Sequence, residues 1–406
     1  MNMVGRFSAS RVRGLSLIEL LVALALGGIL MGGAISLFVN NRATYEITND
    51  MARLQESARF ALQLMSQDIR MAGYVGCVND VTKVNDNIDL DEGQLANITH
   101  GIEGYESGDA AWSPSGHLGE GDAVIAGGLD FNAFMADSDG ITVRYFAGNM
   151  QRTAGDIDNE VVNASPDDAN ATNTVIQVRA LNHDLVDGQA AAVSDCGGAD
   201  LFTVNGDPGE VGGVDTVNAS ALSRSYEALN RAIVTPFMGV RYFVRRNGAN
   251  VPALYRSTLG TEAPVVIDEE VAVELVDGVQ SLQILYGVDA NRDGLPDEFL
   301  SAGQTSVVDA NIKLTTRNDY LSVVAVRISL LLATVDEFGN LYGDTGLDAA
   351  ADQASPWDDR VYDVGAERFC RNGRPAAPDP ACTRNFDPDR RQRRVFQTTV
   401  AVRNFQ

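Results

Sequence analysis

A long apolar run near the N-terminus constrains this chain more than any other feature. Residues 15–39, LSLIELLVALALGGILMGGAISLFV, carry one charged side chain, Glu19. At about 1.5 Å per residue, a helix of this length reaches roughly 37 Å, which is enough to cross a bilayer. The preceding residues contain Arg6, Arg11 and Arg13 and no acid, so the positive-inside rule keeps them in the cytoplasm. The sequence predicts a single membrane span with the rest of the chain outside.

Two simpler interpretations of this segment compete with a functional one. A secretory signal peptide needs a shorter apolar region followed by a cleavage site of small residues, and this run is too long. A plain membrane anchor gives no reason for Glu19, because a lone ionisable group in an apolar span costs several kcal/mol unless it has a partner. Glu19 is therefore a candidate functional residue.

The residues around Glu19 form a recognisable motif. The stretch G-L-S-L-I-E-L-L-V-A-L-A-L-G, which begins at Gly14, resembles the class III signal of prepilins, the precursors of type IV pilins and of type II secretion pseudopilins. The resemblance implies that a prepilin peptidase cleaves after Gly14 and methylates the new amine of Leu15, where the family usually has Phe. Glu19 would then be the fifth residue of the mature chain and would neutralise the terminal amine of a neighbouring subunit.

The helix is expected to continue beyond the membrane. Residues 40–72 lack Pro and Gly and repeat apolar side chains with a period near 3.5, which predicts one apolar stripe on an amphipathic helix. A helix from Leu15 to about Ala72 would reach roughly 85 Å. We expect the stripe to pack on a globular head and also to contact a filament core. Its members are Met51, Leu54, Ala58, Ala61, Met65 and Ala72.

The remainder of the chain predicts a β-rich head. Segments enriched in β-branched and aromatic residues occur at 141–146, 174–180, 239–246, 281–288, 320–334 and 395–404. Asn247-Gly248 predicts a hairpin turn, and residues 78–140 and 147–235 are interpreted as long loop insertions. The predicted fold class is α+β, a long helix joined to a head of antiparallel sheet. The expected divisions are a leader (1–14), a membrane or filament-core helix (15–39), its amphipathic continuation (40–75) and the head (76–406).

Further segments resemble one pilin family. MARLQESARFALQLMSQDIRMAGYVGC, VRYFVRRNGANVPALYR, VDGVQSLQILYGVD and RRVFQTTVAVRNFQ are similar to PilW-type minor pilins. The resemblance implies a minor pilin that starts pilus assembly at or near the tip. It implies an inner-membrane protein with a periplasmic head, which later becomes part of the pilus. The implied partners are other minor and major pilins, the prepilin peptidase, the assembly platform and a tip adhesin. The alternatives are an adhesin or binding module at the tip and a J-like minor pseudopilin of a type II secretion system.

Four cysteines, without a CxxC pair, favour disulfides over zinc in an exported chain. Of the three pairings we favour Cys77 with Cys196 and Cys370 with Cys382, the second closing a loop rich in Pro and Gly. The alternative is four unpaired thiols.

One acidic loop predicts weak calcium binding. In DANRDGLPDE, the oxygen ligands Asp289, Asn291, Asp293 and Asp297 alternate, with Gly294 at the turn. Position twelve is Leu300, which cannot supply a bidentate carboxylate, so the loop is closer to DxDxDGxxD loops than to an EF-hand. The alternative is an Asx-rich turn between strands.

The charge balance excludes other classes of function. The chain has 55 acidic and 31 basic residues, a formal net charge of -24, which argues against nucleic acid as a partner. It holds three histidines and no G-x-S-x-G, P-loop or HExxH motif, so no catalysis is predicted.

Overall fold

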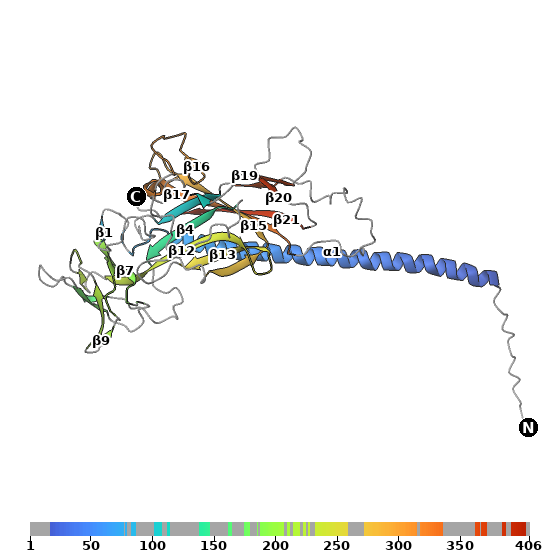
Figure 1. Cartoon of the computed structure of the whole chain (residues 1–406), viewed down its shortest axis with the longest axis horizontal. Coiled ribbons are helices and arrows are strands. Elements are labelled where there is room, and N and C mark those ends of the chain that lie inside the picture. Colours follow the sequence, from blue (N-terminus) through green and yellow to red (C-terminus); the bar gives the residue numbers. More distant parts are fainter. Residues whose placement is uncertain are drawn as a thin grey trace, which may run out of the picture.

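The computed structural model shows one long helix attached to a β-rich head (Figure 1). It describes residues 17–76, 78, 83–86, 101–107, 112–113, 138–146, 161–164, 174–178, 185, 187–206, 209–211, 214–219, 222–224, 226–227, 232–258, 272–314, 317–335, 362–365, 367–371, 384–386 and 391–402.

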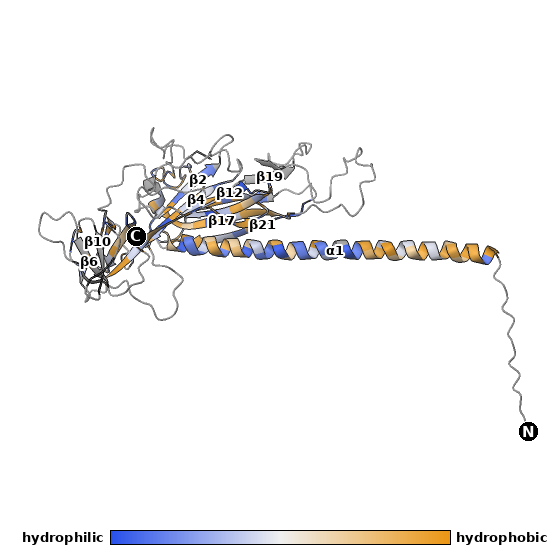
Figure 2. Ribbon diagram, turned by 60° about the horizontal axis from the view of Figure 1, so that its bottom comes forward, coloured by the Kyte–Doolittle hydropathy of each residue, from blue (hydrophilic) through white to orange (hydrophobic). Residues whose placement is uncertain are grey.

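Helix α1 (Leu17–Met71) is continuous over 55 residues, or roughly 80 Å at the standard rise. Its N-terminal half projects away from the head, and its C-terminal half lies against it (Figure 1). Figure 2 shows that the projecting half is almost uniformly apolar, whereas the docked half alternates apolar and polar residues. The helix ends before Gly73, which takes φ 71°, a left-handed conformation that glycine adopts at no steric cost.

The head is built from strands in four sheets. In chain order they are β1 (Val84–Asp86), β2 (Ile102–Ser107), β3 (Trp112–Ser113), β4 (Gly140–Phe146), β5 (Val161–Ala164), β6 (Thr174–Val178), β7 (Ala190–Asp195), β8 (Gly198–Thr203), β9 (Gly209–Val211), β10 (Val214–Ala219), β11 (Tyr226–Glu227), β12 (Ile233–Arg246), β13 (Pro252–Thr258), β14 (Val273–Asp277), β15 (Val279–Val288), β16 (Glu298–Leu300), the 3-10 helix η5 (Arg317–Ser322), β17 (Val323–Ala333), β18 (Tyr362–Val364), β19 (Glu367–Arg371), β20 (Arg384–Phe386) and β21 (Arg393–Ala401).

Two sheets carry the helix. One has the order β16-β15-β17-β21 and is antiparallel throughout. The other runs β1-β8-β7-β12-β4-β2-β3, with β13 and β14 added beside β12. Helix α1 packs against β21, β17, β14 and β4, and so bridges both sheets.

Strand β12 connects the two ends of the head. Its first residues pair with β7, and its later residues pair with β4 on one side and β13 on the other. The sheet β11-β5-β6-β10-β9 forms a lobe near β7, at the end of the head farthest from the N-terminus of α1 (Figures 1 and 2). The small sheet β18-β19-β20 packs on the four-stranded sheet through Val364 and Phe369 against Leu331 and Val395.

The largest core lies between α1 and the two sheets. The helix contributes Leu54, Ala58, Ala61, Met65, Ile69 and Ala72, all at most 5% exposed. Removing a large apolar side chain such as Leu54 or Met65 from water contributes about 1.5–3 kcal/mol. The predicted stripe is therefore confirmed as the docking face, except that Met51 is only partly buried.

The strand predictions are confirmed with shifted boundaries. Strand β12 begins earlier than the expected segment 239–246, and the first residues of 320–334 form η5 instead of a strand. The hairpin at Asn247 is confirmed between β12 and β13, and its turn extends to Val251, whose N–H donates to the Asn247 side chain at 3.0 Å. The regions interpreted as loop insertions also contain short strands that the sequence pattern did not predict, such as β7 and β8.

Candidate functional site

The projecting half of α1 is an unburied apolar surface. From Leu17 to Phe38, its large apolar side chains are between 52% and 77% exposed. It is long and apolar enough to cross a membrane. So large an exposed apolar surface is stable only in a membrane or against other apolar helices.

Glu19 is the one acidic residue in the first turn of α1. Partial positive charge at a helix N-terminus stabilises a carboxylate there. Its neighbours Leu17, Ile18 and Leu20 are apolar and exposed, so any environment that covers them also surrounds Glu19. Gly14 and Leu15, the predicted processing residues, lie outside the described residues.

A buried polar cluster fixes the other end of the helix. Asp68 is 5% exposed, and its carboxylate accepts hydrogen bonds from Tyr145 Oη at 3.0 Å and from Arg256 Nε at 3.1 Å. Tyr242 Oη also donates to Asp68. Burial, together with the negative charge of Asp68, raises the pKa of both tyrosines well above the ordinary value, so both remain protonated donors. The cluster joins α1 to β4, β12 and β13.

A second buried polar cluster fixes the sheet beneath the helix. Glu103 and Arg144 form an ion pair between β2 and β4, with side chains 2% and 1% exposed. Arg241 on β12 donates to Thr142 Oγ1 and to Tyr105 Oη, each at 2.8 Å. These bonds hold β2, β4 and β12 in register, and so fix the platform on which α1 docks.

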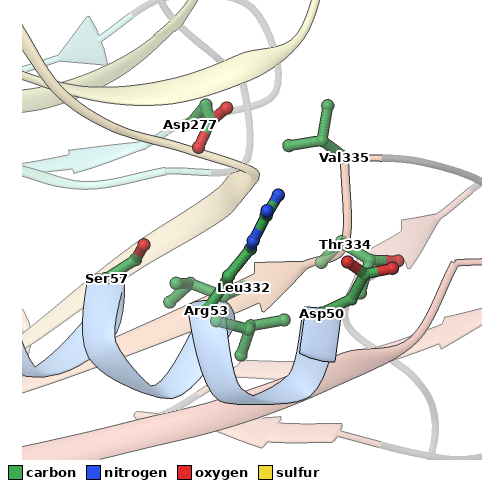
Figure 3. Close-up of a pocket in the computed structure, with 9 residues that line it drawn as sticks. Asp50, Arg53, Ser57, Asp277, Leu332, Thr334 and Val335 are labelled. Carbon is green, nitrogen blue, oxygen red and sulfur yellow. The ribbon is translucent and has the colours of Figure 1, made fainter. Parts of the chain in front are cut away.

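A pocket of about 370 Å³ lies where α1 enters the head. Figure 3 shows Arg53 pointing from the helix between Asp277 and Val335. The pocket therefore combines charged groups from both the helix and the head at their junction. Its lining is Asp50, Arg53, Leu54, Ser57, Asp277, Leu332, Ala333, Thr334 and Val335.

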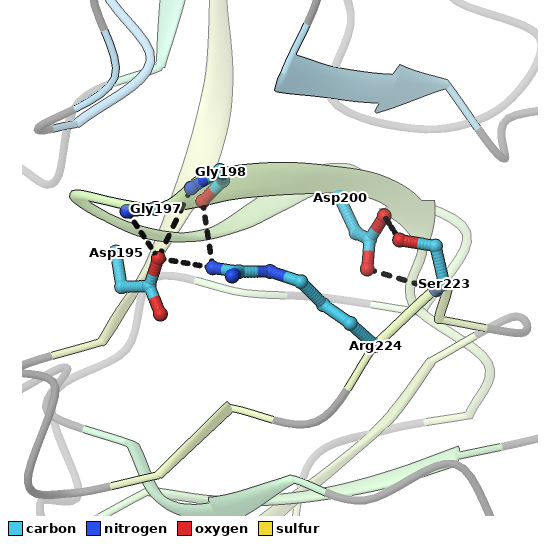
Figure 4. Close-up of polar contacts among 6 residues, drawn as sticks. All are labelled: Asp195, Gly197, Gly198, Asp200, Ser223 and Arg224. Atoms are coloured by element: carbon cyan, nitrogen blue, oxygen red, sulfur yellow. Dashed lines mark hydrogen bonds and ion pairs between the residues drawn. The ribbon is translucent and has the colours of Figure 1, made fainter.

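The hairpin between β7 and β8 is tied to the far lobe by side chains. Asp195 Oδ1 accepts hydrogen bonds from the N–H groups of Gly197 and Gly198, at 2.7 and 3.1 Å, and forms an ion pair with Arg224 (Figure 4). Beside it, Asp200 accepts hydrogen bonds from the N–H and hydroxyl of Ser223, at 2.9 and 2.6 Å. Both carboxylates therefore hold the segment 222–224, and Asp195 also holds the turn at Gly197 and Gly198.

Cys196 lies at the tip of this hairpin and is disulfide-bonded. Because Cys196 is bonded, the alternative of four unpaired thiols is wrong. Cys77, Cys382 and the side chain of Cys370 lie outside the described residues, so both pairings stay predictions. Gly76, the residue before Cys77, lies so close to the side chain of Ser194 that a Cβ at position 76 would collide with it.

The acidic loop 289–297 forms a chain of Asx-type turns. Asp289 accepts backbone N–H bonds from Arg292 at 2.6 Å and Gly294 at 2.7 Å, and Asp297 accepts one from Ala290 at 2.8 Å. Asn291 and Asp293 accept from backbone N–H groups two residues further on, the pattern of Asx turns.

This loop gives no direct sign of a metal site. Partial burial works to raise the pKa of Asp289, but the backbone hydrogen bonds outweigh it and lower the pKa. In the part of the chain that the structure describes, no group of three or more His, Cys, Asp or Glu side chains is arranged to hold a metal ion. The geometry agrees with the Asx-rich turn, and calcium binding stays a prediction.

Sequence reasoning missed Asp68, although a signal was present. The stripe runs through 54, 58, 61 and 65 to 72, and the next member by spacing after Met65 is 68. A carboxylate at an apolar stripe position indicates a buried partner, which here is Arg256 with two tyrosines. The partners come from distant strands, so their identity could not be read from the helix alone.

Comparison with known protein families agrees with the geometry. Residues 9–35 match the prokaryotic N-terminal methylation motif, and residues 241–404 match the family described as type IV pilus-assembly protein W. No curated protein and no solved structure matches significantly. The second match covers β13 to β21, including the whole four-stranded sheet that carries α1, and it is a pilus assembly family, not an enzyme family. Over these residues the chain matches a PilW-type, prepilin-like protein related to the type IV pilus.

Proposed function

We propose that this protein is a minor pilin that joins other minor pilins in the complex that initiates type IV pilus assembly, at or near the tip. The observation that carries the proposal is the division of α1 into two halves. One half is exposed and apolar with Glu19 in its first turn, and the other is fixed in the head by the apolar stripe and Asp68. Such a helix transmits a contact made by its N-terminal half to the whole head.

Maturation would place a positive charge close to Glu19 in the assembled filament. Cleavage after Gly14 would leave a terminal ammonium on Leu15, which the peptidase methylates. When the apolar halves of several subunits pack together, both the ammonium and the Glu19 carboxylate leave water. A buried pair of opposite charges fixes register more than it adds stability, but removal of one partner from such a pair costs about 3–5 kcal/mol. Glu19 would thus set the axial position of each new subunit relative to its neighbour.

The size of the head supports a place at the tip. The head carries four sheets beside α1, and its far lobe extends beyond the C-terminal end of the helix (Figure 1). Lateral neighbours restrict the space along a filament shaft, whereas the tip leaves the upper surface free. Before assembly, the apolar half of α1 would lie in the inner membrane with the head in the periplasm.

Incorporation into fibres tests the proposal. Glu19→Ala should lower the ratio of fibre-bound to membrane-bound protein by more than a hundredfold, because about 3 kcal/mol corresponds to that factor. Glu46→Ala is the matched control, since Glu46 is a carboxylate on the same helix in an exposed pair with Arg42 at 2.9 Å. The control should stay within about twofold, as exposed pairs contribute little. Equal incorporation of both variants would overturn the role assigned to Glu19.

A second candidate function is binding at the pilus tip. The lobe of β5, β6, β9, β10 and β11 lies at the end of the head farthest from the membrane-crossing half of α1, where a tip subunit would present it outward (Figures 1 and 2). Connecting segments on a rigid sheet often carry binding residues. A strain that lacks residues 161–178, which hold β5 and β6, but keeps β7 and β8, and that still makes pili but does not adhere, would support this function, whereas loss of pili would favour the assembly role alone.

The remaining alternative is a J-like minor pseudopilin of a type II secretion system. It shares the leader, the helix and a large β-rich head, so only the cellular process separates the two. Deletion should abolish twitching motility and leave protein secretion intact if the pilus assignment is right.

A further inference from the structure

Strand β21 is an unusually long open edge. It ends the four-stranded sheet, pairs with β17 through nine residues, and has no strand on its other side among those the structure describes. The other strands that end a sheet in the described part of the chain span at most five residues. A long row of unpaired N–H and C=O groups is a template for pairing with another chain.

The register shows which groups of β21 face outward. The N–H of Val402 donates to the C=O of Val324 at 2.9 Å, so the even-numbered residues of β21 bond to β17. The N–H and C=O groups of Val395, Gln397 and Thr399 consequently point away from the sheet. The side chains of Gln397 and Thr399 are exposed and that of Val395 is half-buried, so this edge is accessible.

Most features that protect edge strands are missing from 395–399. The pairing with β17 is regular, without a bulge, and the strand contains neither Pro nor Lys. Its two arginines, Arg393 and Arg394, stand at the start of the strand, and Arg394 lies 5.5 Å from the ring centre of Phe396. The middle of the edge is therefore left open.

A groove of about 690 Å³ runs between this edge and α1. Its described lining contains two arginines, Arg59 and Arg70, and no carboxylate, in a chain whose net charge is -24. Arg59 pairs with Glu56 on the exposed helix surface. Because Glu56 offsets the charge of Arg59, Arg70 carries the local positive charge of the groove, and this charge favours a partner with carboxylates. The full lining is Arg59, Leu62, Gln63, Ser66, Gln67, Arg70, Met71, Gln397 and Thr398.

We propose that the outer edge of β21 accepts an extended, acidic segment from another subunit of the same assembly by strand addition. This inference rests on the proposed function, because it requires neighbouring subunits with parallel helices. Strand β21 packs beside α1, so a lateral neighbour in a bundle of such helices approaches this edge (Figure 1). Main-chain bonds to Val395, Gln397 and Thr399 would supply affinity, and Arg70 would select acidic side chains.

Photo-crosslinking tests the proposal directly. The full-length chain, with benzoylphenylalanine in place of Gln397, is expressed in its own membrane together with the other pilus components and irradiated. We expect a covalent product whose crosslinked peptide comes from another subunit and contains Asp or Glu in an extended segment. A product restricted to lipid, to the same chain or to a peptide without acids would overturn the proposal.

Two pairs of variants separate the edge from general damage. Gln397→Pro removes an outward N–H without removing a bond to β17, and Gln397→Ala keeps that N–H. Arg70→Glu reverses a charge in the groove, and Lys313→Glu makes the same change at an exposed lysine outside it. We expect Gln397→Pro and Arg70→Glu to lower the amount of co-purified subunits by at least about tenfold, and both controls to stay within about twofold.

The outcomes also separate this inference from the proposed function. Protease resistance of the full-length variants checks whether they fold. If Gln397→Pro does not fold, Arg70→Glu still tests the proposal, because it leaves strand β21 unchanged. Wild-type protein that co-purifies with other subunits but gives no intersubunit product at 397 would refute the edge and leave the assembly role standing. Wild-type protein that co-purifies with no other subunit would refute both.

Discussion

Replacement of Asp68 should loosen the helix from the head without affecting its membrane half. In Asp68→Ala, the guanidinium of Arg256 loses its ion partner, and the hydroxyls of Tyr145 and Tyr242 lose their acceptor. Breaking a buried pair from one side costs about 3–5 kcal/mol. Because the Arg256 side chain is still 23% exposed and retains some water, we expect the lower end, about 3 kcal/mol.

The helix offers a matched control in Glu56. Its pair with Arg59 at 2.9 Å joins side chains that are 68% and 74% exposed, so Glu56→Ala should cost only about 0.2–0.5 kcal/mol. Asp68→Asn keeps the shape and one acceptor oxygen but loses the charge, and should fall between the two.

Amide hydrogen exchange of the full-length protein in detergent measures this difference segment by segment. A cost of about 3 kcal/mol raises the population of the undocked helix more than a hundredfold, and exchange of residues 54–71 should accelerate by that factor. Exchange that changes equally in Asp68→Ala and Glu56→Ala would show that the apolar stripe alone holds the helix, and would refute this reasoning.

Other predictions concern the buried tyrosines, the disulfide and the acidic loop. Burial raises the pKa of Tyr242 above its ordinary value of 10.0, so the contribution of this tyrosine to stability is constant below pH 10. Stability should fall above pH 10, because the unfolded chain ionises first, and denaturant midpoints at pH 9 and 11 measure this. Peptide mapping without reduction should find Cys77 linked to Cys196, and a link from Cys196 to another cysteine would contradict it. Calorimetry should detect a weak heat of calcium binding in the wild type, and Asp293→Ala should remove it. If the wild type gives no such heat, the loop that contains Asp289 is a structural turn and not a calcium site.

The sequence predicted the helix well because its signals are local and periodic. The apolar run, the stripe and the left-handed Gly73 act within a few residues of one another, and α1 follows them closely. The long strands β15 and β17 were also readable, since β-branched and aromatic residues fill them.

Apart from β6, the short strands between β4 and β12 were not predicted, because they carry weak local signals. Strand β7 reads AAAVSD and is buried throughout, yet alanine and serine favour no strand by themselves. Its burial comes from pairing with β8 and β12, contacts that no window of sequence contains. The partners of Asp68 were hidden in the same way, since Arg256 is far from it in the chain.

Intact mass spectrometry of the protein recovered from sheared surface fibres tests the central claim most directly. We expect a mature chain that begins at N-methylated Leu15, present in wild-type fibres and missing from those of a Glu19→Ala strain. An uncleaved chain, or one cut elsewhere and absent from fibres, would contradict the account and leave an exported domain with a simple membrane anchor.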